Sequence, residues 1–337
     1  MSTAKTTRSA RSRARVRRAA GLLAGAALIA ALPSASALAD TTAATPPDGS
    51  ANFSFQTHND PRDPTFNQLL GINNEGLIAG YFGSGAAGHP NKGYLLHKPY
   101  GSGSFQPENF PGSVQTQVTG LNDRGVSVGF YSTMNTASQK NNNFGFYAIR
   151  GHFHKVVFPT GGKSTPPVDQ LLGVNNEGLA VGFYTDAGST NHGYVYNIAR
   201  HTFRRVNVSG DTNVTAAAIN NLGDIAGSAT NAAGSTEGFL LRSDGKVFHL
   251  DVPGASSTQA FGVNDGDEVV GAYMVGSGSN ATTYGFVWTP GTGFETVNDP
   301  NGVGSTTING VNDRGTIVGF YTDAAGNTDG MVGYGIG

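Results

Sequence analysis

Cysteine is absent from the 337-residue sequence, and tryptophan occurs only once. The chain therefore has no disulfides, no thiolate metal site and no cysteine-linked lipid. Charged residues make up only 13% of the chain, and its longest apolar run, Ala19–Leu32, is shorter than the roughly 20 residues of a membrane-spanning helix. Runs with the 3.6-residue period of a helix are also missing, which excludes a helical fold.

Basic residues are concentrated at the N-terminus. Residues 1–39 hold seven of the 21 Lys and Arg residues and none of the 23 Asp and Glu residues. The apolar run is followed by Ala37-Leu38-Ala39, a pattern typical of signal-peptidase cleavage. The sequence thus predicts a signal peptide at 1–39, a flexible segment at 40–52 and a secreted, extracellular protein. Both the general and the twin-arginine export routes stay open.

Without its first 39 residues the chain carries 14 basic and 23 acidic residues, a formal charge of −9. No basic footprint remains for nucleic acid or for an anionic membrane, so we expect neither nucleic-acid binding nor membrane insertion. The remaining 298 residues can bury a core without disulfides, and we expect a monomer. The 50 glycines accompany 19 Phe and 12 Tyr residues, which indicates frequent turns and not disorder.

One motif recurs six times, at intervals of 44 to 53 residues. A representative copy is Gly310-Val-Asn-Asp-Arg-Gly-Thr-Ile-Val-Gly-Phe320. The shared asparagines are Asn73, Asn122, Asn175, Asn220, Asn264 and Asn312. The Asn-(Asn/Asp)-x-Gly step predicts a tight hairpin turn between two strands, because Asn and Gly accept a positive φ at little cost.

Each repeat predicts four short strands, A to D, and six such units predict an all-β, six-bladed β-propeller over residues 53–337. An open solenoid is the alternative. The sixth repeat ends after strand C, whereas residues 55–61 match residues 294–300 of the fifth strand D in spacing. We therefore expect the N-terminal strand to complete the last blade, which leaves no open edge.

The repeat resembles the HAF-type extracellular repeat of bacterial secreted proteins. The third copy fits best, through Tyr184, Asp186, Gly188, His192, Gly193 and Tyr194. Other residues replace the histidine in the remaining copies, namely Lys92, Phe144, Glu237, Tyr284 and Asp329. The resemblance implies export and a propeller-like fold, and it implies no particular activity.

Two sets of residues recur where the B–C and D–A loops are expected to meet on one face. A polar residue precedes each strand-A glycine by three positions: Gln68, Gln117, Gln170, Thr215, Gln259 and Thr307. Aromatic residues end strand B in five repeats: Phe82, Tyr131, Tyr184, Tyr273 and Tyr321. Both sets fit ligand binding at the pore mouth, through hydrogen bonds and stacking, and both also fit a structural role in polar satisfaction and packing.

Charged residues in the B–C loops are the candidates for chemistry. Asp323, Asn327 and Asp329 offer oxygen ligands for Ca²⁺ or form an Asx turn, and no other cofactor is expected. Candidate acid–base residues are His192, Asp186, Glu237, Asp323 and Asp329. Gly125-Val-Ser127-Val-Gly129 matches the G-x-S-x-G pattern, but Ser127 falls within a strand, so it is not a hydrolase nucleophile.

These features favour a non-catalytic binding propeller that recognises an extracellular glycan, a cell-surface polymer or a protein through its variable loops. The alternative is an extracellular polysaccharide lyase or hydrolase with its site at the pore mouth. Two carboxylates, or a histidine with a tyrosine, clustered on the loop face would favour the enzyme.

Overall fold

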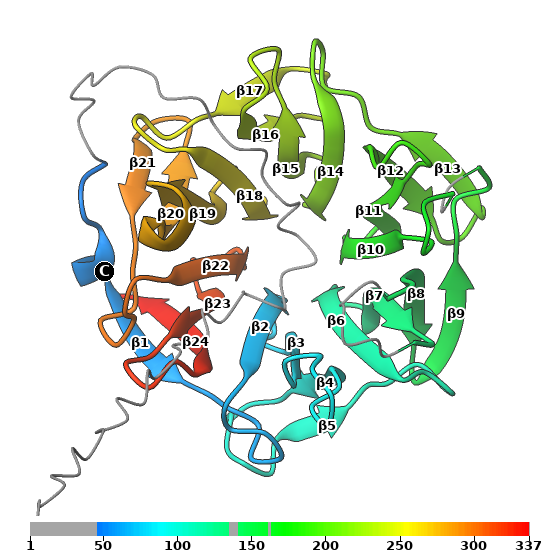
Figure 1. Cartoon of the computed structure of the whole chain (residues 1–337), viewed down its shortest axis with the longest axis horizontal. Helices are drawn as coiled ribbons and strands as arrows, with labels where there is room; N and C mark the ends of the chain where they lie inside the picture. Colours follow the sequence, from blue (N-terminus) through cyan, green and yellow to red (C-terminus); the bar gives the residue numbers. More distant parts are fainter. Residues whose placement is uncertain (1–45, 135–140, 161–162, 337) are drawn as a thin grey trace, which may run out of the picture.

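The structure, a computed structural model, describes residues 46–134, 141–160 and 163–336. The signal peptide that the sequence predicts at 1–39 lies outside these residues. Six antiparallel, four-stranded sheets are arranged in a ring around a central channel (Figure 1). The predicted six-bladed β-propeller is thereby confirmed. Within the described ranges, no helix is long and apolar enough to cross a membrane.

Four strands build each blade, and blades 1 to 6 follow the order of the repeats. The innermost A strands are β2 (Asn67–Ile72), β6 (Gln115–Leu121), β10 (Asp169–Val174), β14 (Thr212–Ile219), β18 (Ser257–Val263) and β22 (Thr306–Val311). The B strands are β3 (Ile78–Phe82), β7 (Val126–Ser132), β11 (Leu179–Thr185), β15 (Ile225–Thr230), β19 (Val269–Val275) and β23 (Ile317–Thr322). The C strands are β4 (Lys92–Leu96), β8 (Phe144–Ile149), β12 (Asn191–Asn197), β16 (Thr236–Leu241), β20 (Thr282–Thr289) and β24 (Thr328–Gly335). The outermost D strands are β5 (Phe105–Pro107), β9 (His152–Val156), β13 (Thr202–Arg205), β17 (Val247–Leu250), β21 (Gly293–Thr296) and β1 (Phe53–Thr57).

The N-terminal strand closes the ring. In Figure 1, β1 lies beside β24 at the outer edge of blade 6, and the two strands pair from Phe53–Gly335 to Thr57–Met331. The segment before β1 also contacts the fold, since the amide of Gly49 donates to the backbone oxygen of Thr296 in blade 5. It includes a short 3-10 helix, η1 (Ser50–Asn52), and a second one, η2 (Gly278–Asn280), lies in blade 5. The backbone oxygen of Pro47 accepts from the amide of Thr296 in turn, so the contacts of the fold begin at least six residues before the predicted boundary at residue 53.

Asparagine side chains join all six blades at the C-terminal ends of the A strands. The side-chain Nδ2 of each motif asparagine donates to the backbone oxygen of the motif asparagine in the next blade, at 2.8 to 3.2 Å. A second closed ring links the residues that follow them, Asn74, Asp123, Asn176, Asn221, Asp265 and Asp313, through backbone amides donating to side-chain oxygens. The repeated Asn-(Asn/Asp) pair therefore both shapes a turn and connects neighbouring blades.

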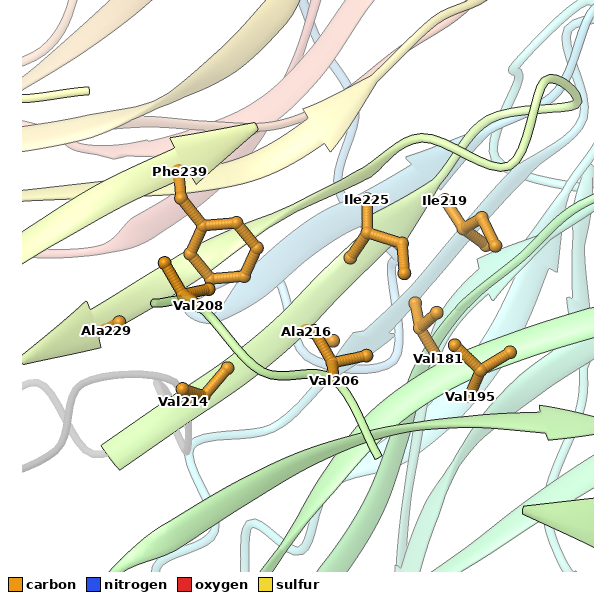
Figure 2. Close-up of a cluster of buried hydrophobic side chains, with 10 residues drawn as sticks. All are labelled: Val181, Val195, Val206, Val208, Val214, Ala216, Ile219, Ile225, Ala229 and Phe239. Carbon is orange, nitrogen blue, oxygen red and sulfur yellow. The ribbon is translucent and has the colours of Figure 1, made fainter. Parts of the chain in front are cut away.

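Apolar side chains fill the space between blades. Figure 2 shows one such cluster, in which Val181 and Val195 of blade 3 lie near Ile225 of blade 4, and Phe239 of blade 4 lies at the other end of the cluster. Phe239 is fully buried. Because every blade packs on two neighbours in this way, the hydrophobic core is divided into layers that follow the ring.

Candidate functional site

The ends of the propeller differ in the length of their connections. The A–B and C–D turns lie on one end, called here the turn face, and the longer B–C and D–A loops lie on the other, called the loop face. Each blade places one residue of strand C at the loop face, namely Lys92, Phe144, His192, Glu237, Tyr284 and Asp329. Each of these pairs across the sheet with a strand-B residue, namely Phe82, Tyr131, Tyr184, Ala229, Tyr273 and Tyr321. Six different side chains at equivalent places make this face asymmetric.

The strand-B tyrosines that the sequence offered for stacking are packed inside the blades. Tyr184 and Tyr321 are only 2% and 3% exposed. The Tyr184 ring stacks on Phe158 with the centroids 4.6 Å apart, and its hydroxyl accepts a hydrogen bond from Arg205. The Tyr321 hydroxyl is paired with Thr57. Neither ring offers a free face to a sugar, so the structure shows them in the packing role.

Five members of the polar ring predicted at the pore mouth are buried: Gln68, Gln117, Gln170, Thr215 and Thr307. The hydroxyl of Tyr81 donates to Gln68, and Gln117 donates to Asn91. Gln259 is partly exposed, and it too has an interaction within the chain. The two channel cavities, of about 70 and 80 Å³, are lined by other residues, those from Leu70 to Asn74 and their equivalents. The polar ring thus lines neither of these two cavities.

On blade 3, the structure brings His192 and Asp186 together as the sequence suggested. Their Nε2 and Oδ2 atoms are 2.9 Å apart, and the imidazole stacks on Tyr184. The other carboxylate oxygen of Asp186 accepts hydrogen bonds from the amides of Gly188 and Thr190 in the same loop. The hydrogen bond to His192, followed by that from Thr190, lowers the pKa of Asp186. Both carboxylate oxygens of Asp186 are thus hydrogen-bonded, one to His192 and the other to the two loop amides.

On blade 6, the residues considered for Ca²⁺ form a turn. Both carboxylate oxygens of Asp323 accept hydrogen bonds from Asn327, one from the backbone amide and one from the side chain. Asp329 instead accepts a hydrogen bond of 2.6 Å from Asn59, which precedes the buried Asp60. The oxygens of Asp323 are occupied within the loop, as expected of an Asx turn.

A third group lies on blade 4 and comprises Asp211, Glu237 and His249, called here the blade-4 cluster. Asp211 ends the D–A loop that enters the blade, Glu237 begins strand C, and His249 lies near the end of strand D. Their ligand atoms all lie within 4.8 Å of one another, and in the described part of the chain this is the one trio of His, Asp or Glu residues with such geometry. The Nδ1 atom of His249 is 2.5 Å from Glu237 Oε1 and 3.8 Å from Asp211 Oδ2.

Negative charge dominates the blade-4 cluster. The side chains of Asp211 and Glu237 are 6% and 10% exposed, whereas His249 is 48% exposed. Among the described residues, no Lys or Arg forms an ion pair with either carboxylate, and Asp211 Oδ2 has no hydrogen-bond partner. Burial and then the charge of Glu237 raise the pKa of Asp211, against the opposing effect of His249. The cluster therefore holds two acidic groups that have no Lys or Arg partner in the described residues, beside an accessible imidazole.

The sequence of blade 4 departs from the repeat at the two positions where strands B and C meet the loop face. Ala229 stands where the other five blades have an aromatic ring, directly across the sheet from Glu237. The missing ring leaves room for the carboxylate, which Asn231 also holds through a 2.9 Å hydrogen bond to Oε2. Glu237 was a sequence candidate, but Asp211 and His249 were not. In the sequence, only the unusual pair Ala229 and Glu237, where the other repeats have an aromatic residue at the first position, indicated that blade 4 is different.

Ser127, in the G-x-S-x-G match, has a structural partner. Its hydroxyl donates a 2.8 Å hydrogen bond to Glu108, and both side chains are buried. Burial raises the pKa of Glu108, while the hydrogen bond from Ser127 opposes that rise. Ser127 lies on β7, as its place in the repeat predicts.

No family model matches the sequence, and no curated protein does. The resemblance to HAF-type repeats therefore stays a prediction. Solved structures similar in fold include virginiamycin B lyase from Staphylococcus aureus, with a TM-score of 0.41 and 10% identity over 83% of this chain and 99% of that one. AofleA from Arthrobotrys oligospora has a TM-score of 0.48 and 12% identity over 83% and 85%. A PL25 polysaccharide lyase, an ulvan lyase, has a TM-score of 0.41 and 13% identity over 80% and 78%. These likenesses concern the propeller fold alone.

Proposed function

We propose that this chain is a secreted propeller that binds a neutral or cationic extracellular glycan through its loop face, with the blade-4 cluster as the polar anchor. The observation that supports this is the pair of nearly buried carboxylates, Asp211 and Glu237, with no Lys or Arg partner among the described residues. Carboxylates accept hydrogen bonds from sugar hydroxyls and attract ammonium groups, and charge-assisted bonds of this kind are strong. The −9 charge of the predicted mature chain disfavours anionic polymers.

The anchor lies where the B–C and D–A loops of blade 4 meet its strands, on the face whose loops vary between blades. Ligands are usually bound by loops that a rigid scaffold positions, because the scaffold tolerates sequence change there. His249 reaches solvent at the same place and offers a second polar contact. The site proposed here is therefore on the rim of blade 4 and not over the channel.

Calorimetric titration with neutral, amino and uronic-acid oligosaccharides tests this proposal. We expect a neutral or amino sugar to bind, and Glu237→Gln and His249→Ala each to weaken binding about tenfold, the effect of losing a charged hydrogen bond. His154→Ala is the control, because His154 is an exposed histidine on strand D of blade 2 that stacks on Tyr147 and lies outside the blade-4 cluster. Unchanged affinity in both blade-4 variants would refute this site.

An extracellular polysaccharide-acting enzyme is the second candidate, favoured by the orientation of His249. Its Nδ1 atom is paired with Glu237, and no described residue hydrogen-bonds to its Nε2 atom. An imidazole fixed at one nitrogen can take or give a proton at the other, as general acid–base catalysis requires. New reducing ends or unsaturated uronates that form with wild type and His154→Ala, and not with His249→Ala, would establish the enzyme.

A further inference from the structure

We infer that Asp211, Glu237 and His249 bind a divalent first-row transition-metal ion of the zinc class. This deepens the proposed function, because it assigns a ligand to the same anchor and rests on that anchor being a binding site. Three donor groups from separate elements converge there, with all ligand atoms within 4.8 Å of one another. The anchor then consists of these three side chains and a bound cation.

The spacing of the donor atoms suits such an ion after a small adjustment. Zinc lies about 2.0–2.2 Å from nitrogen and oxygen ligands, so two ligands in a tetrahedral site are about 3.4 Å apart. The 3.8 Å between His249 Nδ1 and Asp211 Oδ2 is close to that value. The 2.5 Å between His249 Nδ1 and Glu237 Oε1 is that of a short hydrogen bond, and a metal bound to both atoms would replace its proton and widen the gap.

Charge and burial point to the same conclusion. Asp211 is 6% exposed, and its Oδ2 atom lacks any hydrogen-bond partner in the described structure. A nearly buried carboxylate oxygen is costly to leave unpaired, and the neighbouring charge of Glu237 adds repulsion. A divalent cation removes both costs at once. His249, 48% exposed, leaves a path from solvent to the site.

The donor set selects the class of metal. One imidazole nitrogen and two carboxylate oxygens suit zinc and its neighbours, whereas Ca²⁺ and Mg²⁺ take oxygen ligands only. Three protein ligands leave a position open, as in zinc sites that also bind water or substrate. Asn231 acts as a positioning residue, because its amide holds the second oxygen of Glu237 and directs the first towards His249.

The test titrates the chelator-treated protein with Zn²⁺, Mn²⁺ and Ca²⁺ alone, by calorimetry and elemental analysis, with no sugar present. We expect one Zn²⁺ per chain and much weaker Ca²⁺ binding. His249→Ala should lower zinc affinity at least about 100-fold and Asn231→Ala about 10-fold, as expected for the loss of a ligand and of an outer partner. His154→Ala should leave it unchanged.

Less than one Zn²⁺ per chain, or equal zinc affinity in wild type and His249→Ala, would overturn the inference. His249 is half exposed at the edge of the blade, so its variant is expected to fold, and a matching circular dichroism melt without metal verifies this. Zinc should also raise the melting temperature of wild type and His154→Ala, and not that of His249→Ala, by mass action. A failed sugar titration with intact zinc binding would reject the proposed glycan function alone, and the reverse result would reject the metal alone.

Discussion

The side-chain Nδ2 of Asn312 donates a 3.1 Å hydrogen bond to the backbone oxygen of Asn73, although 239 residues separate them. This bond completes the ring of motif asparagines that passes through all six blades. The Oδ1 atom of Asn312 accepts hydrogen bonds from the amides of Arg314 and Thr316 in its own turn. One side chain therefore both forms a hairpin and joins the last blade to the first.

Replacing Asn312 by Ala should lower the free energy of unfolding by about 2–3 kcal/mol, because three hydrogen bonds are lost at about 1 kcal/mol each. Urea denaturation measures the change. Arg314→Ala is the control, since it keeps the backbone amide and removes only an exposed side chain. A loss below 1 kcal/mol would mean that the asparagine ring contributes little to closure.

The architecture could be predicted from the sequence because the repeats impose the same local structure six times. The motif Asn-Asp-Arg-Gly at 312–315 identifies one hairpin, and the match between Phe55 and Phe294 locates the strand that closes the ring. The contacts of residues 46–52 with blade 5 were not predictable in this way. They have no counterpart in the other repeats, and they depend on backbone hydrogen bonds such as that from Gly49 to Thr296.

The candidate site was only partly predictable. Alignment of the repeats identifies Glu237 as different, since its equivalents have other side chains. Asp211 lies on a D–A loop whose length varies, so alignment gives it no fixed equivalent. The strand-D equivalent of His249 in blade 2 is Lys155, since the two pair with Phe239 and Phe146, so the repeat does not mark a histidine at this position. Only the folded chain shows that these three side chains converge.

The closing strand β1 should be required for stability. Deleting residues 51–60 exposes the edge of β24 and should lower the melting temperature of the whole ring. A finer test is Phe55→Ala, because Phe55 packs against the core of blade 6 whereas the adjacent Gln56 is exposed. We expect a loss of about 1–2 kcal/mol for the half-buried Phe55, less than for a fully buried Phe, and almost none for Gln56→Ala. An unchanged melting curve after the deletion would show that the ring is closed without this strand.

The strand-B glycine of the motif should tolerate no side chain. A Cβ atom on Gly182 would lie 1.9 Å from the backbone oxygen of Gln170 on the neighbouring strand, and the other five blades give 2.0 to 2.4 Å. Gly182→Ala must therefore move one strand, at a cost of about 1–3 kcal/mol or more. Gly291→Ala is the control, because no atom lies within 4 Å of its Cβ position. Similar unfolding midpoints for the two variants would contradict this explanation of the conserved spacing within the repeat.

The buried Asp169 predicts how stability changes with pH. Burial raises the pKa of Asp169 from 3.8 to about 6, against hydrogen bonds from the Tyr194 hydroxyl and the Phe158 amide that lower it. Between pH 4 and 6 the folded chain thus binds more protons at this group than the unfolded chain. Its contribution to stability is present below pH 4 and is lost as the pH rises towards 6, by about 3 kcal/mol in total.

Asparagine at position 169 can accept from the Phe158 amide and donate to the Tyr194 oxygen without titrating. The difference in unfolding free energy between wild type and Asp169→Asn should therefore shift by about 2.4 kcal/mol in favour of the variant from pH 4 to pH 7. Urea denaturation at several pH values measures this difference, and Asp244→Asn, at an exposed turn, provides the control. Parallel curves for wild type and Asp169→Asn would show that the carboxyl group titrates alike in the folded and unfolded chains, and that its burial is compensated by the two hydrogen bonds.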